Sequence, residues 1–584
     1  MNAIKKIFSL DLRSLALFRI GIASIILWDL VLRALYLKDH YTDLGVLPRG
    51  TLIDKFMSEW TFSLHLLNGQ FYFQATLFII AALAAISLML GYRTKLMTIA
   101  SWFLLVSLQN RNYMILQGGD TVLRLLLFWG MFLPLGAQYS IDRALSTVKE
   151  ANKRFFSMAT VGIIIQIMLI YIFNALTKTH ADWTKNYNAL WYALHIDQFV
   201  LPLGEVLREF PRLCRVLTFL THKFELIAPL ILLVPFKNYI LRIFLVISFI
   251  GFHIGIASTL NVGLFPFICI IMWPIILPRE FWGIFKFTKE NKATLYYDKD
   301  CGFCKKMILM VQVLLFQEKS KIQTLQSNEK TNSILKEQDT WVVQTHDNQY
   351  LTQFDALRYL FSQSKLFSIF AFIFSSKAMK HFGNRIYRTI ANNRNTLGKL
   401  TKHLQYKDVL INRSIIANAL CLFFLVSILL HNYSTLKSNN FRLPDFIKNT
   451  NLILRTSQNW KMFAPKPLRN DGWFVIPGKL KNGKDVELFF ENKNSWIKPK
   501  DIEDMYPTQR WRKYMMNIAS KKYKKQRLYF GKWICRSWNR EHTGDAQLES
   551  FQIYFMLEQT KLNLDEVKVH KNRLWLHNCF AKGS

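Results

Sequence analysis

The chain has 584 residues, several times the size of a usual domain, so two to four folding units are expected. Its hydrophobic fraction of 51% exceeds that of soluble proteins, and its charged fraction is only 20%. A formal net charge of +36 could suggest a nucleic-acid-binding protein, but the sequence has no recognisable nucleic-acid motif, and much of the basic excess borders apolar runs or lies in the C-terminal segment. A lipid bilayer with anionic headgroups, and no nucleic acid, is therefore the expected partner.

Long apolar runs predict membrane-spanning helices, because about 18 or more apolar residues cross the hydrocarbon core of a bilayer. The candidate spans are Leu15–Leu37, Phe71–Leu90, Leu96–Leu108, Val122–Leu135, Met158–Thr177, Phe224–Phe236, Ile240–Leu260, Val262–Leu277 and Ser414–Leu430. The first run lacks a small-residue cleavage site and more spans follow it, so we expect a retained helix and not a signal peptide.

Lysine and arginine near the span ends predict the orientation, because loops on the cytoplasmic side are enriched in them. Lys5, Lys6 and Arg13 precede the first span, and Arg93 and Lys95 lie between the second and third. The N-terminus is therefore expected in the cytoplasm. Eight spans return the chain to that side, and the ninth exports the C-terminal segment.

The fold class expected from these features is a polytopic α-helical membrane protein with an inserted α/β domain and a β-rich C-terminal domain. The boundaries are residues 1–285 for a membrane domain of about eight helices, 286–413 for the cytoplasmic insert, 414–432 for the ninth helix and 433–584 for an extracytoplasmic domain. Alternation such as Val486 to Phe490, together with glycine and proline, predicts short strands and turns in the last unit.

The insert carries the motif Cys301-Gly-Phe-Cys304 directly after a short aromatic strand that ends at Asp298. An apolar helix follows, so Cys301 is expected at a helix N-terminus, where the dipole and free backbone amides stabilise a thiolate. Cys304 lies one turn further and can resolve a mixed disulfide on Cys301, and Asp298 can move protons during the exchange. The pattern predicts redox chemistry.

Two other interpretations of the cysteine pair remain open. A C-x-x-C pair can be half of a zinc site, but no second ligand pair of matching spacing lies nearby, so no metal is expected. The pair could also be structural, although a purely structural disulfide would not persist in a reducing compartment.

The sequence around the cysteines resembles a known family. The matching features are Asp298-x-x-Cys301-x-x-Cys304, Thr324-Leu-Gln-Ser, Asp339-Thr-Trp-Val-Val, Phe354-Asp-Ala-Leu and Ala391-Asn-Asn-Arg394. Together they are similar to the DCC family of thiol–disulfide oxidoreductases, over roughly Lys292 to Leu400. The resemblance implies a thioredoxin-like fold and thiol–disulfide oxidoreductase activity.

Ionisable residues within or beside the apolar runs mark either paired contacts or a functional cavity, because charge in hydrocarbon is costly. They are Arg19, Asp29, Arg33, Asp120, Arg124, Lys178 and His253. For Arg19, Asp29 and Arg124 we favour structural pairing, and for His253 a polar contact between helices. Lys178 ends a span, where it could extend to the interface or act as a partly desolvated general base.

A second resemblance covers roughly Asp11 to Pro278. Its motifs are Leu17-Phe-Arg19-Ile-Gly, Tyr41-Thr-Asp-Leu-Gly-Val-Leu-Pro48, Gly118-Gly-Asp120, Leu125-Leu-Leu-Phe-Trp129 and Tyr171-Ile-Phe-Asn-Ala-Leu-Thr-Lys178-Thr-His-Ala-Asp182-Trp183. They resemble the horizontally transferred transmembrane (HTTM) domain, whose best-known member is the vitamin K-dependent gamma-carboxylase. The segment with Trp460-Lys-Met-Phe-Ala-Pro465 is similar to the tail of bacterial members.

This second resemblance implies a catalytic base at Lys178 and an isoprenoid quinone as cofactor. Arg111 stands where the carboxylases carry a histidine, and an arginine can hold an anion but does not shuttle protons near neutral pH. The expected location is a bacterial inner (cytoplasmic) membrane. Cys535 and Cys579 would then lie outside, where they could form a disulfide.

The leading hypothesis is a membrane oxidoreductase that couples the Cys301/Cys304 dithiol to a carboxylase-like, quinone-binding membrane domain. One alternative is a non-catalytic scaffold or maturation factor that binds an exported peptide or protein client. Another is a vitamin K-dependent-type glutamate carboxylase.

Overall fold

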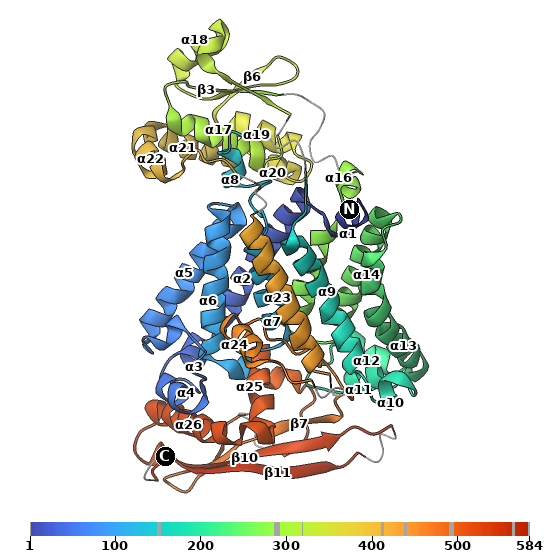
Figure 1. Ribbon diagram of the computed structural model, residues 1–584. Coiled ribbons are helices and arrows are strands. Elements are labelled where there is room, and N and C mark those ends of the chain that lie inside the picture. The colour runs from blue at the N-terminus through green and yellow to red at the C-terminus, as the bar shows by residue number, and fades with distance from the viewer. Residues whose placement is uncertain are drawn as a thin grey trace.

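The structure is a computed structural model that describes residues 2–148, 153–284, 293–317, 319–409, 411, 414–436, 441–489, 496–562 and 567–581. Figure 1 shows a helix bundle with one domain at each end. The N-terminus and the insert lie at one end, and the C-terminal domain lies at the other. We call these the insert end and the C-terminal end of the bundle.

Six helices among the described residues are long and apolar enough to cross a membrane. They are α2 (Leu12–Ala34), α5 (Phe71–Leu90), α9 (Met158–Thr177), α13 (Pro211–Ile227) with its continuation η3 (Ala228–Leu233), α14 (Asn238–Thr259) and α23 (Ile415–Ser434). The chain is therefore a multi-pass membrane protein. Each of the six overlaps an expected span.

Three further expected spans fall on shorter or more polar helices. They are α6 (Thr94–Arg111), α7 (Gly118–Gly130), and α15 (Phe265–Met272) with η4 (Trp273–Ile276). Pro266 and Pro274 are the second residues of α15 and η4. Proline is tolerated there because the first turn of a helix does not use its backbone N–H groups. Helix α13 starts thirteen residues before the expected span at Phe224, because charged residues in its first half hide the apolar pattern.

Short elements complete the membrane domain. They are α1 (Asn2–Phe8), β1 (Leu10–Asp11), α3 (Leu37–Tyr41), α4 (Arg49–Phe56), η1 (Leu64–Leu66), η2 (Tyr113–Ile115), α8 (Ile141–Ala144), β2 (Arg154–Phe155), α10 (Ala181–Thr184), α11 (Ala189–Leu194), α12 (Pro202–Arg208) and α16 (Arg279–Ile284). Strand β1 pairs with β2 in antiparallel fashion near the insert end.

The insert is an α/β domain with a mixed four-stranded sheet in the order β4-β3-β5-β6. The strands are β3 (Thr294–Tyr297), β4 (Lys321–Thr324), β5 (Val342–Gln344) and β6 (Tyr350–Thr352), and β3 runs parallel to β4 and antiparallel to β5. The helices are α17 (Gly302–Leu314), η5 (Leu325–Ser327), α18 (Glu329–Gln338), α19 (Gln353–Gln363), α20 (Ser368–Ile373), α21 (Lys377–Asn392), α22 (Arg394–Leu400) and η6 (Thr401–His403). Leu295, Ile308, Val343 and Leu360 form its buried core, which confirms the expected α/β class.

The C-terminal domain contains a five-stranded sheet, so the expected β-rich class is also confirmed. Its strands are β7 (Asn470–Val475), β8 (Pro477–Leu480), β9 (Asp485–Glu487), β10 (Leu548–Gln559) and β11 (Val569–Asn578), in the order β11-β10-β8-β9 with β7 also paired to β10. Its helices are α24 (Asp445–Ile453), η7 (Glu503–Met505), α25 (Gln509–Ala519), η8 (Lys521–Gln526), α26 (Arg527–Glu541) and η9 (Gly544–Ala546). A disulfide joins Cys535 on α26 to Cys579 after β11.

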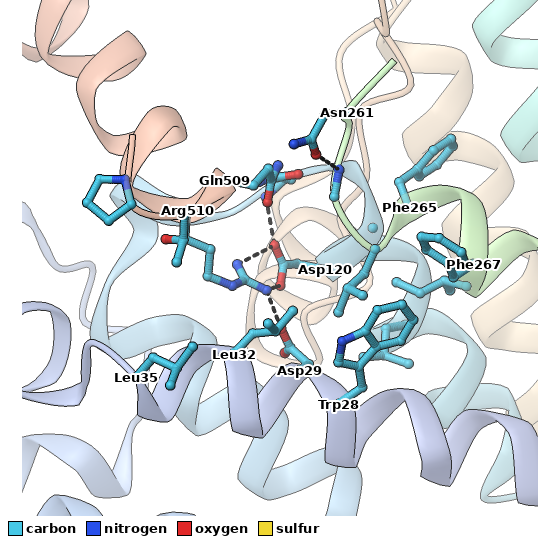
Figure 2. A pocket seen from close by; sticks show the side chains of 18 residues that line it. Trp28, Asp29, Leu32, Leu35, Asp120, Asn261, Phe265, Phe267, Gln509 and Arg510 are labelled. Carbon is cyan, nitrogen blue, oxygen red and sulfur yellow. Dashed lines mark hydrogen bonds and ion pairs between the residues drawn. The ribbon is translucent and has the colours of Figure 1, made fainter. Parts of the chain in front are cut away.

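A buried ionic cluster ties the C-terminal domain to the membrane helices. Arg510 of α25 places its guanidinium between Asp29 of α2, at 2.5 Å, and Asp120 of α7, at 3.1 Å (Figure 2). Arg33 contacts the same two carboxylates at 2.7 and 2.5 Å. We call these four residues the Arg510 cluster, in which two cations balance two anions.

Arg19 and Arg124, the other charged residues for which a structural contact was expected, make such contacts. Arg19 donates to the carbonyl of Tyr139 at 2.5 Å, and Arg124 donates to the amide oxygen of Gln109 at 2.7 Å. Cys269 and Cys421 are buried free thiols, as expected for cysteines within spans. Most of the basic run from Lys521 to Arg527 is exposed, although Arg527 is buried.

Candidate functional site

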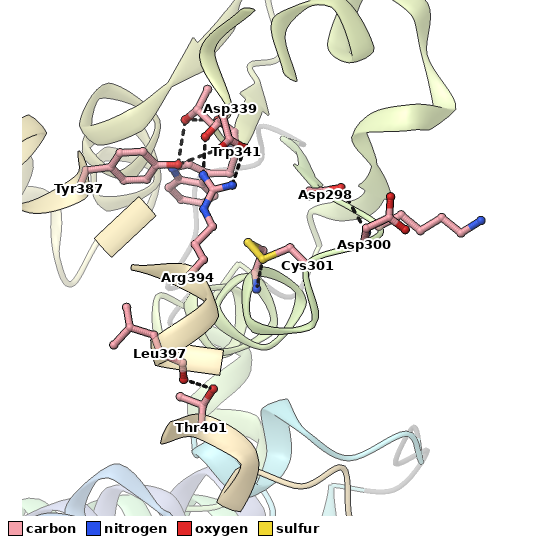
Figure 3. Close-up of a disulfide and its surroundings, with 12 residues drawn as sticks. Asp298, Asp300, Cys301, Asp339, Trp341, Tyr387, Arg394, Leu397 and Thr401 are labelled. Atoms are coloured by element: carbon pink, nitrogen blue, oxygen red, sulfur yellow. Dashed lines mark hydrogen bonds and ion pairs between the residues drawn. A yellow bond between two sulfur atoms is a disulfide. The ribbon is translucent and has the colours of Figure 1, made fainter. Parts of the chain in front are cut away.

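The Cys301–Cys304 pair closes the first turn of α17. Strand β3 leads into a tight turn in which the Cys301 backbone N–H donates to the carbonyl of Asp298 at 3.2 Å. Cys301 is the N-cap residue of α17, and its Sγ accepts the backbone N–H of Cys304 at 3.2 Å. The two sulfur atoms form a disulfide with a Cα–Cα distance of 5.3 Å (Figure 3). The strand–turn–helix order expected from the sequence is therefore the one observed.

The disulfide lies in a partly exposed turn. Both cysteines are half-buried, and Gly302 between them is exposed, with no atom within 4 Å of the place that a Cβ would occupy. The turn that carries the two cysteines therefore lies partly at the surface of the insert. The arrangement suits thiol–disulfide exchange, which needs direct access to one sulfur.

The polar groups drawn around the disulfide come from distant segments. Arg394 on α22 donates to the Asp339 carboxylate at 2.7 Å, and the Tyr387 hydroxyl accepts the backbone N–H of Trp341 at 3.1 Å (Figure 3). No role for Arg394 was assigned from the sequence beyond its place in a family motif. Arg394 therefore ties α22 to the segment between α18 and β5, and Asp339 balances its charge.

Asp298 lies beside the motif, but its carboxylate hydrogen bonds lead elsewhere. One carboxylate oxygen accepts from the side-chain amide of Gln326 at 2.7 Å and from the backbone N–H of Asp300 at 3.2 Å. The proposed role of Asp298 in proton transfer therefore stays a prediction.

Lys178 lies in a different site, at the C-terminal end of the bundle. It follows α9, is only 4% exposed, and pairs through Nζ with the carboxylate of Glu225 on α13. Glu225 also accepts the side-chain N–H of Asn174 at 3.0 Å, and the ring of Trp183 lies 4.3 Å from Nζ. The amine of Lys178 is therefore held in a buried pair and does not reach solvent.

A cavity of about 400 Å³ opens beside this pair, between the membrane helices and the C-terminal domain. Aromatic and apolar side chains form much of its wall, among them Phe199, Phe252, Ile256, Leu260, Phe265, Met462 and Phe463. Tyr171 and His253 add polar groups joined by a hydrogen bond of 2.8 Å between α9 and α14, which confirms the interhelical contact expected for His253. We call this space the Lys178 cavity.

Basic side chains are also among the residues that line the Lys178 cavity. They are Lys461, Lys466, Arg512 and Lys513. Arg111 is not among the lining residues, because its guanidinium donates to the carbonyls of Leu47 and Thr42, at 2.7 and 2.9 Å. The residue aligned with the carboxylase histidine thus holds the loop after α3.

Glu225 is not among the residues singled out from the sequence, although its position in an apolar run is informative. It lies inside the expected span Phe224–Phe236, and a carboxylate in an apolar run indicates a buried partner. Among the described residues, no group of three or more histidine, cysteine, aspartate and glutamate side chains could hold a metal ion.

The dithiol and the Lys178 cavity lie at opposite ends of the bundle. Figure 1 shows α17 in the insert, whereas α9 runs away from the insert towards α10 and the C-terminal domain. A ligand in the cavity therefore does not touch the disulfide.

Comparisons with known proteins agree with this division. A family model described as the HTTM domain matches residues 9–282, and one described as the DCC1-like thiol-disulfide oxidoreductase matches residues 295–400. Separate searches of curated proteins and of solved structures found no match. The chain is thus a membrane protein that joins an HTTM domain to a DCC1-like thiol-disulfide oxidoreductase domain.

Proposed function

We propose that this protein carries out thiol–disulfide exchange at Cys301 and Cys304 on the cytoplasmic face of the membrane. The observation that carries the proposal is the partly exposed disulfide across the first turn of α17, directly after β3. The N-cap position of Cys301 favours its thiolate, so Cys301 is the attacking residue and Cys304 the resolving one.

The exchange involves only the reduced Cys301/Cys304 dithiol and one disulfide of the partner, and its atoms and electrons balance. The Cys301 thiolate attacks one sulfur of the partner, a mixed disulfide forms, and the first partner thiolate leaves. The Cys304 thiolate then attacks Sγ of Cys301, which releases the second partner thiolate and closes the Cys301–Cys304 bond. Two electrons pass to the partner, and the relative reduction potentials decide the direction.

The cytoplasmic assignment is supported by charge and by the second disulfide. Lys5 and Lys6 lie on α1, which Figure 1 shows at the insert end of the bundle. Arg93 and Lys95 follow Tyr92, whose hydroxyl donates to the carbonyl of His403 in the insert, so all four cations suit a cytoplasmic side. Cys535 and Cys579 are paired at the other end, and disulfides persist in oxidising compartments. Both observations favour an outer location for the C-terminal domain.

Trapping tests the dithiol proposal. A Cys304→Ser variant should accumulate mixed disulfides on Cys301 that a reductant releases, and a Cys301→Ser variant should not. If Cys304→Ser gives no adduct in cells while its fold is intact, the activity is excluded. Labelling of intact cells tests the compartment, because an impermeant thiol reagent that modifies Cys301 would invert the topology.

A second candidate function belongs to the Lys178 cavity. We propose that Lys178 holds and moves a proton in a reaction of a bound ligand, because the buried pair with Glu225 places an amine and a carboxylate at the wall of an aromatic-lined cavity. The apolar lining and the volume of about 400 Å³ fit the ring of an isoprenoid quinone. A bound quinol would supply reducing equivalents. Any coupling to the dithiol would then need a diffusible carrier.

Two measurements test this second candidate. Extraction of the purified protein with organic solvent should release a quinone, and a Phe252→Asp variant in the cavity should release less. Mass spectrometry of co-expressed exported proteins would detect gamma-carboxyglutamate, which should disappear with Lys178→Ala if the reaction is carboxylation. Absence of both quinone and modified peptide would remove this function and favour a scaffold for an exported client.

A further inference from the structure

Helices α20 and α21 of the insert expose apolar side chains to an unusual degree. On α20, Phe372 is 80% exposed, and Ile369 and Ile373 are also exposed. On α21, Phe382, Ile386 and Ile390 are exposed at intervals of four residues, so they form a stripe along one side of the helix. We call these six residues the α20–α21 apolar face. Exposed apolar patches of this kind usually mark an interaction surface.

The same segment is strongly basic. From Lys365 to Lys407 the sequence has nine lysine and arginine residues and no aspartate or glutamate. Lys380 and Arg394 form ion pairs with carboxylates elsewhere in the insert. Both Arg385 and Arg388 are exposed on α21. Arg385 flanks the apolar stripe, three residues after Phe382, and Arg388 lies on the opposite side, so the helix combines an apolar side with cationic flanks.

Both ends of this segment contact the turns between membrane helices at the insert end of the bundle. Before α20, the ring of Phe367 stacks on Phe316 at 5.8 Å, and Phe316 packs against Tyr139, between α7 and α8, at 4.5 Å. After α22, the carbonyl of His403 accepts the hydroxyl of Tyr92, in the turn from α5 to α6, at 3.3 Å. Figure 1 places α20, α21 and α22 on the side of the insert that faces the bundle.

From these observations we infer that the α20–α21 apolar face lies in the headgroup layer of an anionic bilayer. Amphipathic helices with a basic side bind in this way, with the apolar side sunk to the acyl boundary and lysine and arginine among the phosphates. The chain itself brings the segment to the height of the bilayer surface, which a soluble protein partner would not require. The contact keeps the Cys301–Cys304 pair close to the membrane.

Depth-dependent fluorescence quenching tests the inference on the whole chain. Phe372→Cys and Ile386→Cys are labelled with an environment-sensitive thiol reagent under non-reducing conditions, which leave both native disulfides closed. The labelled protein is reconstituted into vesicles that contain phosphatidylglycerol and a brominated phosphatidylcholine. Ser333→Cys on the exposed face of α18, at the far side of the insert in Figure 1, is the matched control.

We expect strong quenching at residues 372 and 386 and only background quenching at residue 333. A variant with Arg385→Glu and Arg388→Glu should lose most of the quenching, because each cation near an anionic surface contributes about 1 kcal/mol, or roughly fivefold in the equilibrium constant. Equal quenching at all three positions, or none at 372 and 386, would overturn the inference and leave the face to a protein partner. The readout requires no redox activity, so its failure is independent of the proposed function.

Discussion

Replacing Arg510 with methionine should loosen the C-terminal domain from the membrane helices. The guanidinium contacts Asp29 and Asp120, and its side chain is only 12% exposed. Without it, Arg33 alone faces two carboxylates, and one buried negative charge has no balancing cation. Breaking a buried pair in this way costs about 3–5 kcal/mol. A domain of about 150–250 residues loses about 2–4 °C of melting temperature per kcal/mol of stability, so the expected fall is about 10 °C.

The assay is thermal unfolding of the purified protein in nanodiscs, with protease protection of the C-terminal domain as a second readout. Adding Asp120→Asn to Arg510→Met restores the charge balance of the cluster and should recover part of the loss. Lys380→Met removes a half-exposed ion pair and should change stability by at most about 1 kcal/mol. An unchanged melting temperature for Arg510→Met, or no recovery in the double variant, would refute the reasoning.

Two further predictions concern the C-terminal domain. Burial raises the pKa of Asp471 to about 6, although Gln198 donates to its carboxylate at 2.7 Å, so the folded state binds this proton more tightly than the unfolded chain. The associated stability is complete below about pH 4 and is lost as the pH rises through about 6. As the pH rises from about 4 to about 6, the melting temperature of the wild type should therefore fall relative to that of Asp471→Asn. A rise of the wild type relative to the variant would contradict the raised pKa of Asp471. Removing the Cys535–Cys579 bond, which spans a sequence separation of 44, should cost about 4 kcal/mol. Cys535→Ala should thus melt at a lower temperature in the same assay. Dithiothreitol should lower the melting temperature of the wild type more than that of the variant, because only the wild type has this bond to lose; equal shifts in the two proteins would exclude the bond.

Local patterns in the sequence predict much of this fold. Apolar runs identify the spanning helices because the thickness of the bilayer fixes their length. The strand, the tight turn and the helix around Cys301 and Cys304 are likewise local, and so is the β-rich character of the last domain. The first half of α13 is the exception, because its charged residues dilute the apolar signal.

The long-range contacts of the sites could not be predicted in the same way. Arg510 and Asp29 are separated by 481 positions, and Lys178 and Glu225 by 47. Ionisable residues in apolar runs indicate that partners exist, but the packing of the helices decides which partners meet. For the same reason the separation of the dithiol from the Lys178 cavity emerges only from the arrangement of the bundle.

The late position of α23 in the chain has a consequence for biosynthesis. This helix packs against α9, where the Asn418 side chain accepts the backbone N–H of Met158 at 2.8 Å, and its Phe424 contacts Phe128 of α7 at 5.2 Å. Residues 178–414 separate α9 from α23. At about 5–20 residues per second, translation of that interval takes between about ten seconds and most of a minute. During this time the flank of α9 that α23 later covers faces lipid, so the bundle is completed only after the whole redox domain has left the ribosome.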